Sequence, residues 1–245
     1  MEVIPTLTVR NLTKRFPGVV ALNKVDIEIR PGEVHALIGE NGAGKSTLIK
    51  CITGAIQPDE GEILVDGEKH EHLLPGKALA LGISAIYQEF NLVPLLSVAE
   101  NVMLGRYPGK SGTVDKQAMR QQASEIMQEL GVPIDIDCQV KTLSVGFQQL
   151  VEIAKAVSRD ARLIIMDEPS AALTTNELDY LFKIIWKLRG KGISVLYISH
   201  RLDEIFAICD RVTVYRDGQH IKTLNVNDTN ISDLIRLMVN REISN

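Results

Sequence analysis

Residues 39–47 read Gly-Glu-Asn-Gly-Ala-Gly-Lys-Ser-Thr, which fits the pattern Gly-x-x-x-x-Gly-Lys-Ser/Thr. A short, mostly apolar run at residues 33–38 precedes this stretch, and a helical pattern begins at Lys45 and reaches Ile52. The context is therefore a strand, a glycine-rich loop and a helix. In such a loop the glycines let successive backbone N–H groups turn toward a polyphosphate, and the positive N-terminal end of the helix adds to the attraction.

This loop predicts a nucleotide site. We expect Lys45 to reach the β- and γ-phosphates and the Ser46 hydroxyl to bind Mg²⁺. The nucleotide-binding residues expected here are Gly39, Asn41, Gly42, Ala43, Gly44, Lys45, Ser46 and Thr47. The alternative, an ordinary glycine-rich turn, is disfavoured because every fixed position and both flanking elements agree with the motif.

Two acidic residues, Asp167 and Glu168, follow the apolar run Leu163–Met166. Ligands of open α/β sheets bind at the carboxyl ends of such strands. We expect Asp167 to hold the hydrated Mg²⁺ and Glu168 to accept a proton from, or orient, a water that attacks the γ-phosphate. The alternative is a pair of solvated acids that cap the next helix.

His200 follows another apolar run and would reach the same sheet edge, where it could contact the γ-phosphate or hold the attacking water. The alternative interpretation of a histidine at a strand end is a structural role. That structural role is our interpretation of the other four histidines, which are His35, His70, His72 and His220.

Periodicity outlines the rest of the chain. Leu7–Ile29 alternates apolar and polar residues around Pro17-Gly18, which predicts two half-buried strands of an antiparallel edge sheet. Residues 61–67 alternate again and end in Asp-Gly, which predicts another edge strand. Between Asn91 and Ser158 the pattern becomes helical. Its apolar positions include Met119, Ala123, Ile126, Met127 and Leu130.

Buried-strand runs return at Leu163–Met166, Ile193–Ile198 and Val212–Tyr215, with helical stretches such as Glu177–Leu188 between them. Strands that are apolar on both faces and alternate with amphipathic helices imply a mostly parallel sheet covered on both sides. We therefore predict an α/β fold with a mostly parallel sheet, an antiparallel β subdomain at its edge and an inserted α-helical subdomain.

Composition excludes several classes. Of the 245 residues 45% are hydrophobic, which suffices for a substantial core and excludes a disordered tail or a fibre. The formal net charge of −4 disfavours nucleic acid as a partner, because such domains usually carry a basic excess. No run approaches the roughly 18 apolar residues that a membrane span needs, and we expect no secretory signal. The scattered Cys51, Cys138 and Cys209 suit a reducing cytosol.

Together with Leu143-Ser144-Val145-Gly146-Phe147, these motifs resemble the nucleotide-binding domain of an ABC transporter, and the likeness runs from Leu7 to Glu242. The resemblance implies a P-loop NTPase core, with residues 1–90 and 159–245 forming the core and its β subdomain and residues 91–158 the helical subdomain. It also implies ATP and Mg²⁺ as cofactors and ATP hydrolysis as the activity. By the same resemblance the catalytic residues would be Lys45, Glu168 and His200.

Further roles come from the resemblance alone. Phe16 would stack on adenine, and Gln88 would touch Mg²⁺ and the transporter, so that the metal ligands would be Ser46, Gln88 and Asp167. Ser144 and Gly146 would bind a second ATP. In the family two such domains pair head-to-tail, and each ATP lies between the glycine-rich loop of one domain and the signature motif of the other, to which residues 143–147 correspond here.

Departures from the family pattern narrow the resemblance. Val145 and Phe147 replace a glycine and a glutamine of the signature, and Thr174 stands where an aspartate is common. These changes, with Val-Glu-Ile-Ala-Lys-Ala at residues 151–156, are similar to the monosaccharide-importer branch. Members of that branch usually carry two such domains in one polypeptide. We expect a partner domain, either a second copy or a missing C-terminal half.

The leading interpretation is an ATPase subunit at the cytoplasmic face of the membrane that powers import of a small sugar. It would work through separate permease subunits, touched near residues 88–105, and indirectly with a sugar-binding protein outside the cell. A second interpretation is a soluble ABC-type ATPase acting on ribosomes or DNA, which the acidic charge and the lack of a basic linker disfavour. A third is a regulatory module that binds ATP without turnover.

Overall fold

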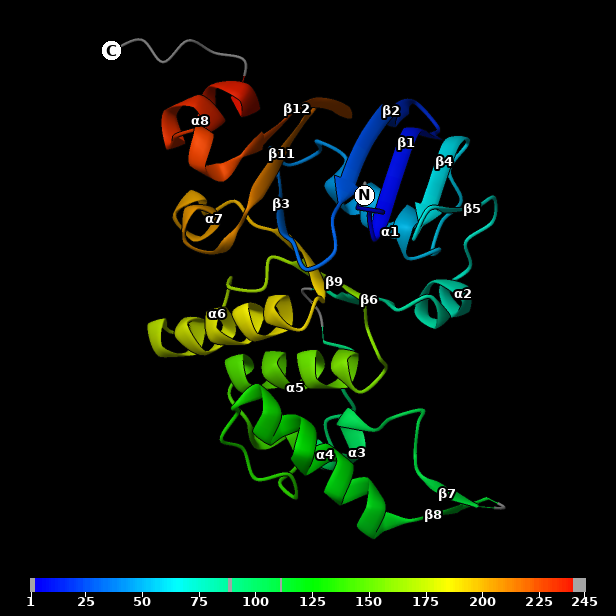
Figure 1. Cartoon of the computed structure of the whole chain (residues 1–245), viewed down its shortest axis with the longest axis vertical. Coiled ribbons are helices and arrows are strands. Elements are labelled where there is room, and N and C mark those ends of the chain that lie inside the picture. Colours follow the sequence, from blue (N-terminus) through cyan, green and yellow to red (C-terminus); the bar gives the residue numbers. More distant parts are fainter. Residues whose placement is uncertain (1–2, 88–89, 111, 240–245) are drawn as a thin grey trace.

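A six-stranded sheet forms the centre of the molecule in the computed structural model, which describes residues 3–87, 90–110 and 112–239 (Figure 1). In spatial order its strands are β12 (Gln219–Asn225), β11 (Arg211–Arg216), β3 (Val34–Ile38), β10 (Ser194–Ile198), β9 (Leu163–Asp167) and β6 (Ile83–Ile86). All neighbouring strands from β11 to β6 are parallel, and β12 is antiparallel to β11. Every residue of β3 and β10 is buried, so the mostly parallel sheet predicted from the apolar runs is confirmed.

A separate antiparallel sheet carries the N-terminal strands. Its spatial order is β2 (Val19–Ile29), β1 (Leu7–Phe16), β4 (Glu60–Val65) and β5 (Glu68–His70). The turn predicted at Pro17-Gly18 joins β1 to β2, with Phe16 opposite Val19. The strand predicted at residues 61–67 is confirmed as β4, but its predicted place at the edge was wrong, because β4 pairs with β1 on one side and with β5 on the other. The turn at Asp66-Gly67 brings β5 back onto β4, and so β5 takes the edge.

Helix α1 (Lys45–Ile52) lies between the two sheets. Its apolar side chains share one buried cluster with residues of β1 and β2 and with Leu37, Leu196 and Ile198 of the central sheet. Alternate residues of the same strands, such as Val195 and Tyr197, point to the opposite face and pack on helices α5 (Val145–Val157) and α6 (Thr175–Gly190). This alternation follows from strand geometry, and it covers the sheet on both faces.

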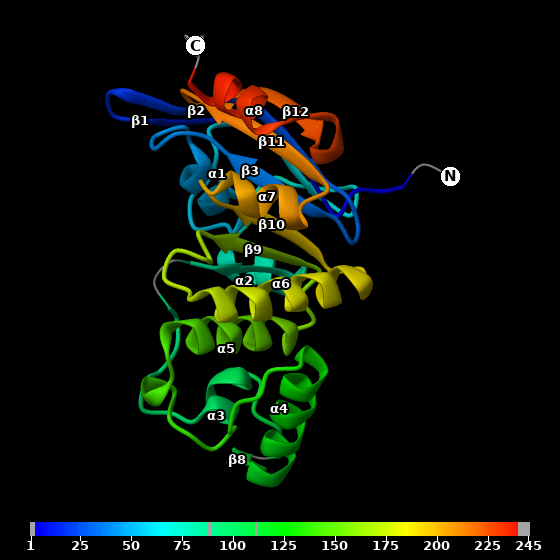
Figure 2. The ribbon, with the colours of Figure 1, turned by 90° about the vertical axis from the view of Figure 1, so that its left-hand side faces the viewer.

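The helical region lies beyond α6 (Thr175–Gly190), as Figures 1 and 2 show. It contains α3 (Val98–Val102), α4 (Lys116–Leu130), the short 3₁₀ helix η1 (Val140–Thr142) and α5 (Val145–Val157). The apolar face expected for α4 is buried at four positions, and Ile126 is partly buried. Sequence periodicity did not anticipate the small hairpin formed by β7 (Gly109–Lys110) and β8 (Thr113–Val114).

The remaining helices cover other surfaces: α2 (Pro75–Ala80), α7 (Leu202–Ile208), the 3₁₀ helix η2 (Val226–Asp228) and α8 (Ile231–Val239). Helices α7 and α8 form a third cluster with the outer face of β11. Within the described residues, no helix combines the length and apolar character that a membrane crossing requires. The three cysteines are free thiols, and burial raises the pKa of Cys51 to about 11.

Candidate functional site

The glycine-rich loop spans the gap between β3 and α1, as its sequence predicts. Gly44 caps the helix with a left-handed backbone at φ +98°, and a Cβ there would stand 2.6 Å from the carbonyl oxygen of Ala21. A Cβ on Gly39 would likewise collide with the backbone oxygen of Tyr215. Only glycine fits these positions, and their close packing holds the loop against β2 and β11.

A cavity of about 420 Å³ opens over this loop. Its walls come from the loop itself, from the ends of β1 and β2 and from the end of β9. The lining residues are Phe16, Val19, Val20, Ala21, Asn41, Gly42, Ala43, Gly44, Lys45, Ser46, Thr47, Asp167 and Glu168. The fold thus brings the predicted loop, the aromatic residue and both carboxylates to one cavity.

The ammonium group of Lys45 lies across the loop. Nζ donates to the carbonyl oxygens of Gly39 at 2.7 Å and Glu40 at 3.1 Å. Burial lowers the pKa of Lys45, and the nearby charges of Glu168 and Asp167 oppose that shift. An anion of high charge density in the cavity would supply the counter-charge that the loop carbonyls provide only as dipoles.

Asp167 is the last residue of β9 and lies beside Ile198, the last residue of β10. Burial raises the pKa of its carboxyl group, and the charge of Lys45 partly offsets this effect. A Mg²⁺ ion in the cavity would favour the ionised form by the same Coulomb attraction.

Glu168 turns the chain away from the strand with a left-handed backbone at φ +51°, and its N–H donates to Ile198 at 2.9 Å. Its Oε2 lies 2.8 Å from Nδ1 of His200, whose side chain is 69% exposed. Glu168 follows β9 directly and His200 is the second residue after β10, and they meet because the two strands are neighbours in the sheet. The carboxylate and the imidazole predicted to act on water therefore form a contact pair at the cavity edge.

A buried carboxylate, Glu204, holds the loops that carry this pair. Its Oε2 accepts hydrogen bonds from the hydroxyls of Ser170 at 2.7 Å, Tyr197 at 2.7 Å and Ser199 at 3.2 Å. The guanidinium of Arg201 lies 2.9 Å from its other oxygen. Ser170 follows Glu168 by two residues and Ser199 precedes His200, so that Glu204 fixes both loops to one point.

Gly39, whose carbonyl oxygen accepts from Lys45, does not itself line this cavity, and Ser144 and Gly146 lie apart from it. Ser144 is the N-cap of α5 and is exposed, whereas Gly146 is buried in the first turn of that helix. Neither residue lines the cavity over Lys45. Gln88 lies outside the described residues.

The oxygen donors fit magnesium. Ser46 and Asp167 both line the cavity and offer a hydroxyl and a carboxylate, the hard ligands that Mg²⁺ prefers. In residues 3–87, 90–110 and 112–239 no cluster of three or more His, Cys, Asp and Glu could hold an ion without help. Such a site suits Mg²⁺ that arrives with nucleotide phosphates and keeps several waters.

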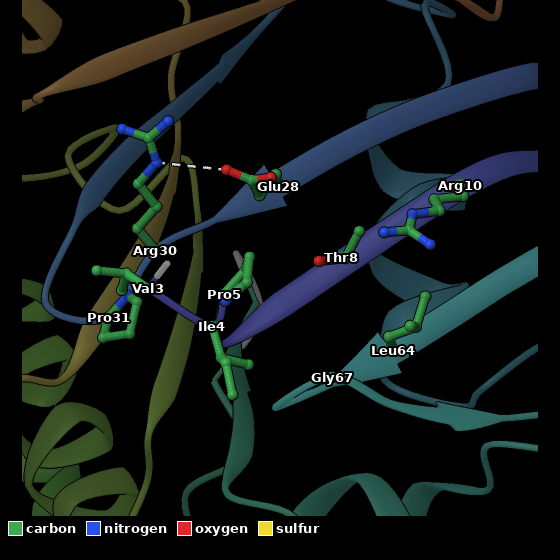
Figure 3. A pocket seen from close by; sticks show the side chains of 10 residues that line it. All are labelled: Val3, Ile4, Pro5, Thr8, Arg10, Glu28, Arg30, Pro31, Leu64 and Gly67. Carbon is green, nitrogen blue, oxygen red and sulfur yellow. Dashed lines mark hydrogen bonds and ion pairs between the residues drawn. The ribbon is translucent and has the colours of Figure 1, made fainter. Parts of the chain in front are cut away.

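A larger cavity, of about 940 Å³, lies at the start of β1 (Figure 3). Arg30 and Glu28 pair across its rim, with Nε and Oε1 3.3 Å apart. Val3, Ile4 and Pro5 form its apolar side. None of the described residues predicted to bind nucleotide lines it, so size alone would misplace the site.

The sequence did not single out Val19, Val20 and Ala21, which wall the cavity. They carry no motif and owe their place to the β1–β2 hairpin. Glu204 was also missed, and no local pattern marks it, because its partners come from two other segments. His35 and His220 do have structural partners: His35 binds Glu33 and Thr213, and His220 lies 3.0 Å from the Thr223 hydroxyl.

The fold and this cavity are those of an ATP-binding cassette, and residues 22–171 match the family described as ABC transporter. The chain belongs to this family. It is 52% identical to the ribose import ATP-binding protein RbsA 3 of Rubrobacter xylanophilus, over 98% of this chain and 49% of that protein. It is 48% identical to the ribose import ATP-binding protein RbsA of Geobacillus kaustophilus, over 97% of this chain and 48% of that protein. The chain thus spans about half the length of these curated relatives.

Solved structures agree with this assignment. A nucleotide-free ATP-binding cassette from an ABC transporter superposes with a TM-score of 0.84 at 28% identity, covering 98% of this chain and 99% of that one. A dimeric cassette of a bacterial ABC transporter has a TM-score of 0.77 at 27% identity, covering 90% of this chain and 98% of that one. The predicted fold class, an α/β P-loop core with an antiparallel sheet and inserted helices, is confirmed.

Proposed function

We propose that the chain binds ATP and hydrolyses it to power import of a small sugar through separate membrane permease subunits. One observation carries the ATPase part of this proposal. The glycine-rich loop, Lys45, Asp167 and Glu168 line one cavity, and His200 contacts Glu168 at its edge. That set contains a phosphate cradle, oxygen ligands for a metal and a general base.

In the proposed reaction Phe16 stacks on adenine and the loop residues hold the phosphates. Lys45 leaves the loop carbonyls and binds the β- and γ-phosphates. Glu168 takes a proton from the attacking water, and His200 orients that water or the γ-phosphate. Ser46, Asp167 and Gln88 would hold Mg²⁺. When bound, Mg²⁺ neutralises the charge that develops on the phosphate oxygens.

We further infer that a second nucleotide-binding domain completes each site. Ser144 and Gly146 lie outside the Lys45 cavity, which supports a role toward an ATP held by a partner domain. A hydroxyl and the N-terminal end of a 13-residue helix can stabilise a γ-phosphate. The partner is a second copy of this chain or a second half of a longer polypeptide.

The names of the relatives support the transport part of the proposal, since they describe ribose import. The helical segment 91–158 would act as the subdomain that transmits closure to the permease, near residues 88–105. The protein would then work at the cytoplasmic face of the membrane, with a sugar-binding protein outside the cell acting indirectly.

Two measurements test the proposal separately. Purified chain should release phosphate from Mg-ATP more than linearly with its own concentration, and Lys45→Ala should abolish the release. A strictly linear dependence would count against shared sites. In the source organism, deletion of the coding sequence should abolish uptake of radiolabelled ribose or another pentose or hexose, and wild-type sequence but not Lys45→Ala should restore it. Unchanged uptake of every sugar tried would refute the transport assignment and leave the ATPase assignment to the first assay.

A further inference from the structure

A carboxylate from α6 covers the first turn of α5. The Ser144 hydroxyl donates to Oε1 of Glu177 at 2.5 Å. The carboxyl group lies so close over Gly146 that a Cβ at that position would overlap it. Helices α5 and α6 run side by side in both views (Figures 1 and 2), so this contact bridges the two helices.

Glu177 is held in that position by its own helix. Thr174 donates to Glu177 Oε2 from its backbone N–H and from its hydroxyl, each at 2.9 Å. Thr174 and Glu177 together form a capping box at the start of α6. One oxygen of the carboxylate therefore caps α6, and the other accepts the hydrogen bond from the Ser144 hydroxyl.

The carboxylate is ionised at neutral pH, because the hydrogen bonds from Ser144 and Thr174 lower the pKa of Glu177. The start of α5 attracts an anion through its helix dipole. Glu177 thus occupies the place, and uses the hydroxyl, that the proposed function assigns to the γ-phosphate of a partner's ATP. The Ser144 hydroxyl has a single proton and cannot donate to both anions. The Glu177 carboxylate and a γ-phosphate bound at the same hydroxyl would also repel each other.

We propose that Glu177 is a latch that occupies the signature end of α5 in the free chain and must release Ser144 before a partner's ATP can bind there. This inference rests on the proposed function, since it takes Ser144 as a ligand of the second nucleotide. Glu177 is a positioning residue, because it acts through Ser144. Glu177 therefore weakens the dimer that two nucleotide-binding domains form around ATP, and it raises the protein concentration at which they associate.

The test uses Glu168→Gln, which the proposed function expects to retain bound ATP, and compares it with the double variant Glu168→Gln/Glu177→Gln. Glutamine keeps the capping box of α6, because both Glu and Gln serve at that position, and it removes the negative charge over Ser144. We expect the dimer dissociation constant, measured by analytical ultracentrifugation at saturating Mg-ATP, to fall about tenfold. Without nucleotide the two proteins should behave alike.

A matched control separates the latch from the cap. Glu100→Gln in the same Glu168→Gln background makes the same change of charge in the capping box of α3, where Glu100 bonds Ser97 and not Ser144. This control should leave the dimer dissociation constant unchanged. If Glu177 were merely structural, Glu177→Gln would behave like the control and would not tighten the dimer.

The outcomes distinguish this inference from the proposed function. If the double variant associates no more tightly than Glu168→Gln, the latch is overturned, whether or not Glu168→Gln itself dimerises. If Glu168→Gln stays monomeric with ATP, pairing between copies fails as part of the proposed function. If Glu168→Gln dimerises and the double variant matches it, the shared site stands and only the latch is lost.

Discussion

Among the described residues that line the cavity, Lys45 is the one that carries a positive charge, and replacing it by alanine removes that charge. Nζ of Lys45 makes two hydrogen bonds to loop carbonyls, and the proposed function transfers them to two phosphates. Each charge-assisted hydrogen bond contributes about 1.5–3 kcal/mol, so two give a loss of about 3–6 kcal/mol of binding free energy. This corresponds to a dissociation constant for Mg-ATP that is roughly 10²–10⁴ times higher.

The two carboxylates that remain in the cavity of Lys45→Ala weaken nucleotide binding further. Without Lys45, Asp167 and Glu168 lose the cation whose charge reaches both of them, and they oppose the entry of a triphosphate. Lys50→Ala is a matched control, because Lys50 is an exposed lysine on the same helix and its removal changes the net charge equally. Isothermal titration calorimetry with Mg-ATP should give parental affinity for the control. A Lys45→Ala affinity within about threefold of the parent would refute the assignment of the phosphate cradle.

Three further predictions concern catalysis, packing and pH. Glu168→Gln should bind Mg-ATP with at least parental affinity and lower kcat by roughly 10²–10⁴, because it loses the general base; equal turnover in a phosphate-release assay would contradict that role. Glu204→Ala should lower the free energy of unfolding in urea by about 2–4 kcal/mol, because it leaves the hydroxyls of Ser170, Tyr197 and Ser199 without their acceptor. Tyr197→Phe removes only one of these hydrogen bonds and should cost only about 1 kcal/mol. Equal losses would mean that Glu204 does not organise the network. The pKa of Glu100 is held below the usual 4.5 by the Ser97 N–H, and that of Glu177 by the Ser144 hydroxyl. The two carboxylates therefore contribute fully to stability above pH 4.5, and this contribution is lost as the pH falls through the lowered pKa values. Glu100→Gln should make the free energy of unfolding in urea fall less steeply as the pH is lowered. An unchanged slope would argue against the cap.

Sequence patterns predicted the elements whose signal is local. The loop of residues 39–47 needs only its glycines, the apolar strand before it and the helix after it, and all three appear where expected. The same holds for the two acids at the end of β9, because the apolar run stops there: Asp167 is the last residue of the strand and is only half-buried, and Glu168 follows it. The hairpin of β7 and β8 was missed, since two-residue strands are too short to show alternation.

Pairing between distant segments was beyond the reach of local patterns. The wrong edge assignment of β4 shows this, because the three-residue β5 that covers it has no recognisable period. The meeting of Glu168 with His200 depends on β9 and β10 being neighbours, and the wall of Val19, Val20 and Ala21 depends on how the β1–β2 hairpin lies over the loop. These contacts join residues far apart in the chain, and their energy is available only after both segments have folded.

The amino-acid order alone determined that this chain has a glycine-rich loop between a strand and a helix, a pair of acids at a strand end and an α/β core, because glycine conformation and apolar periodicity act over a few residues. The tertiary structure alone decided which side chains share the cavity and that Glu177 covers Ser144. Those two residues are 33 positions apart, and only the packing of α6 against α5 brings the carboxylate to the hydroxyl.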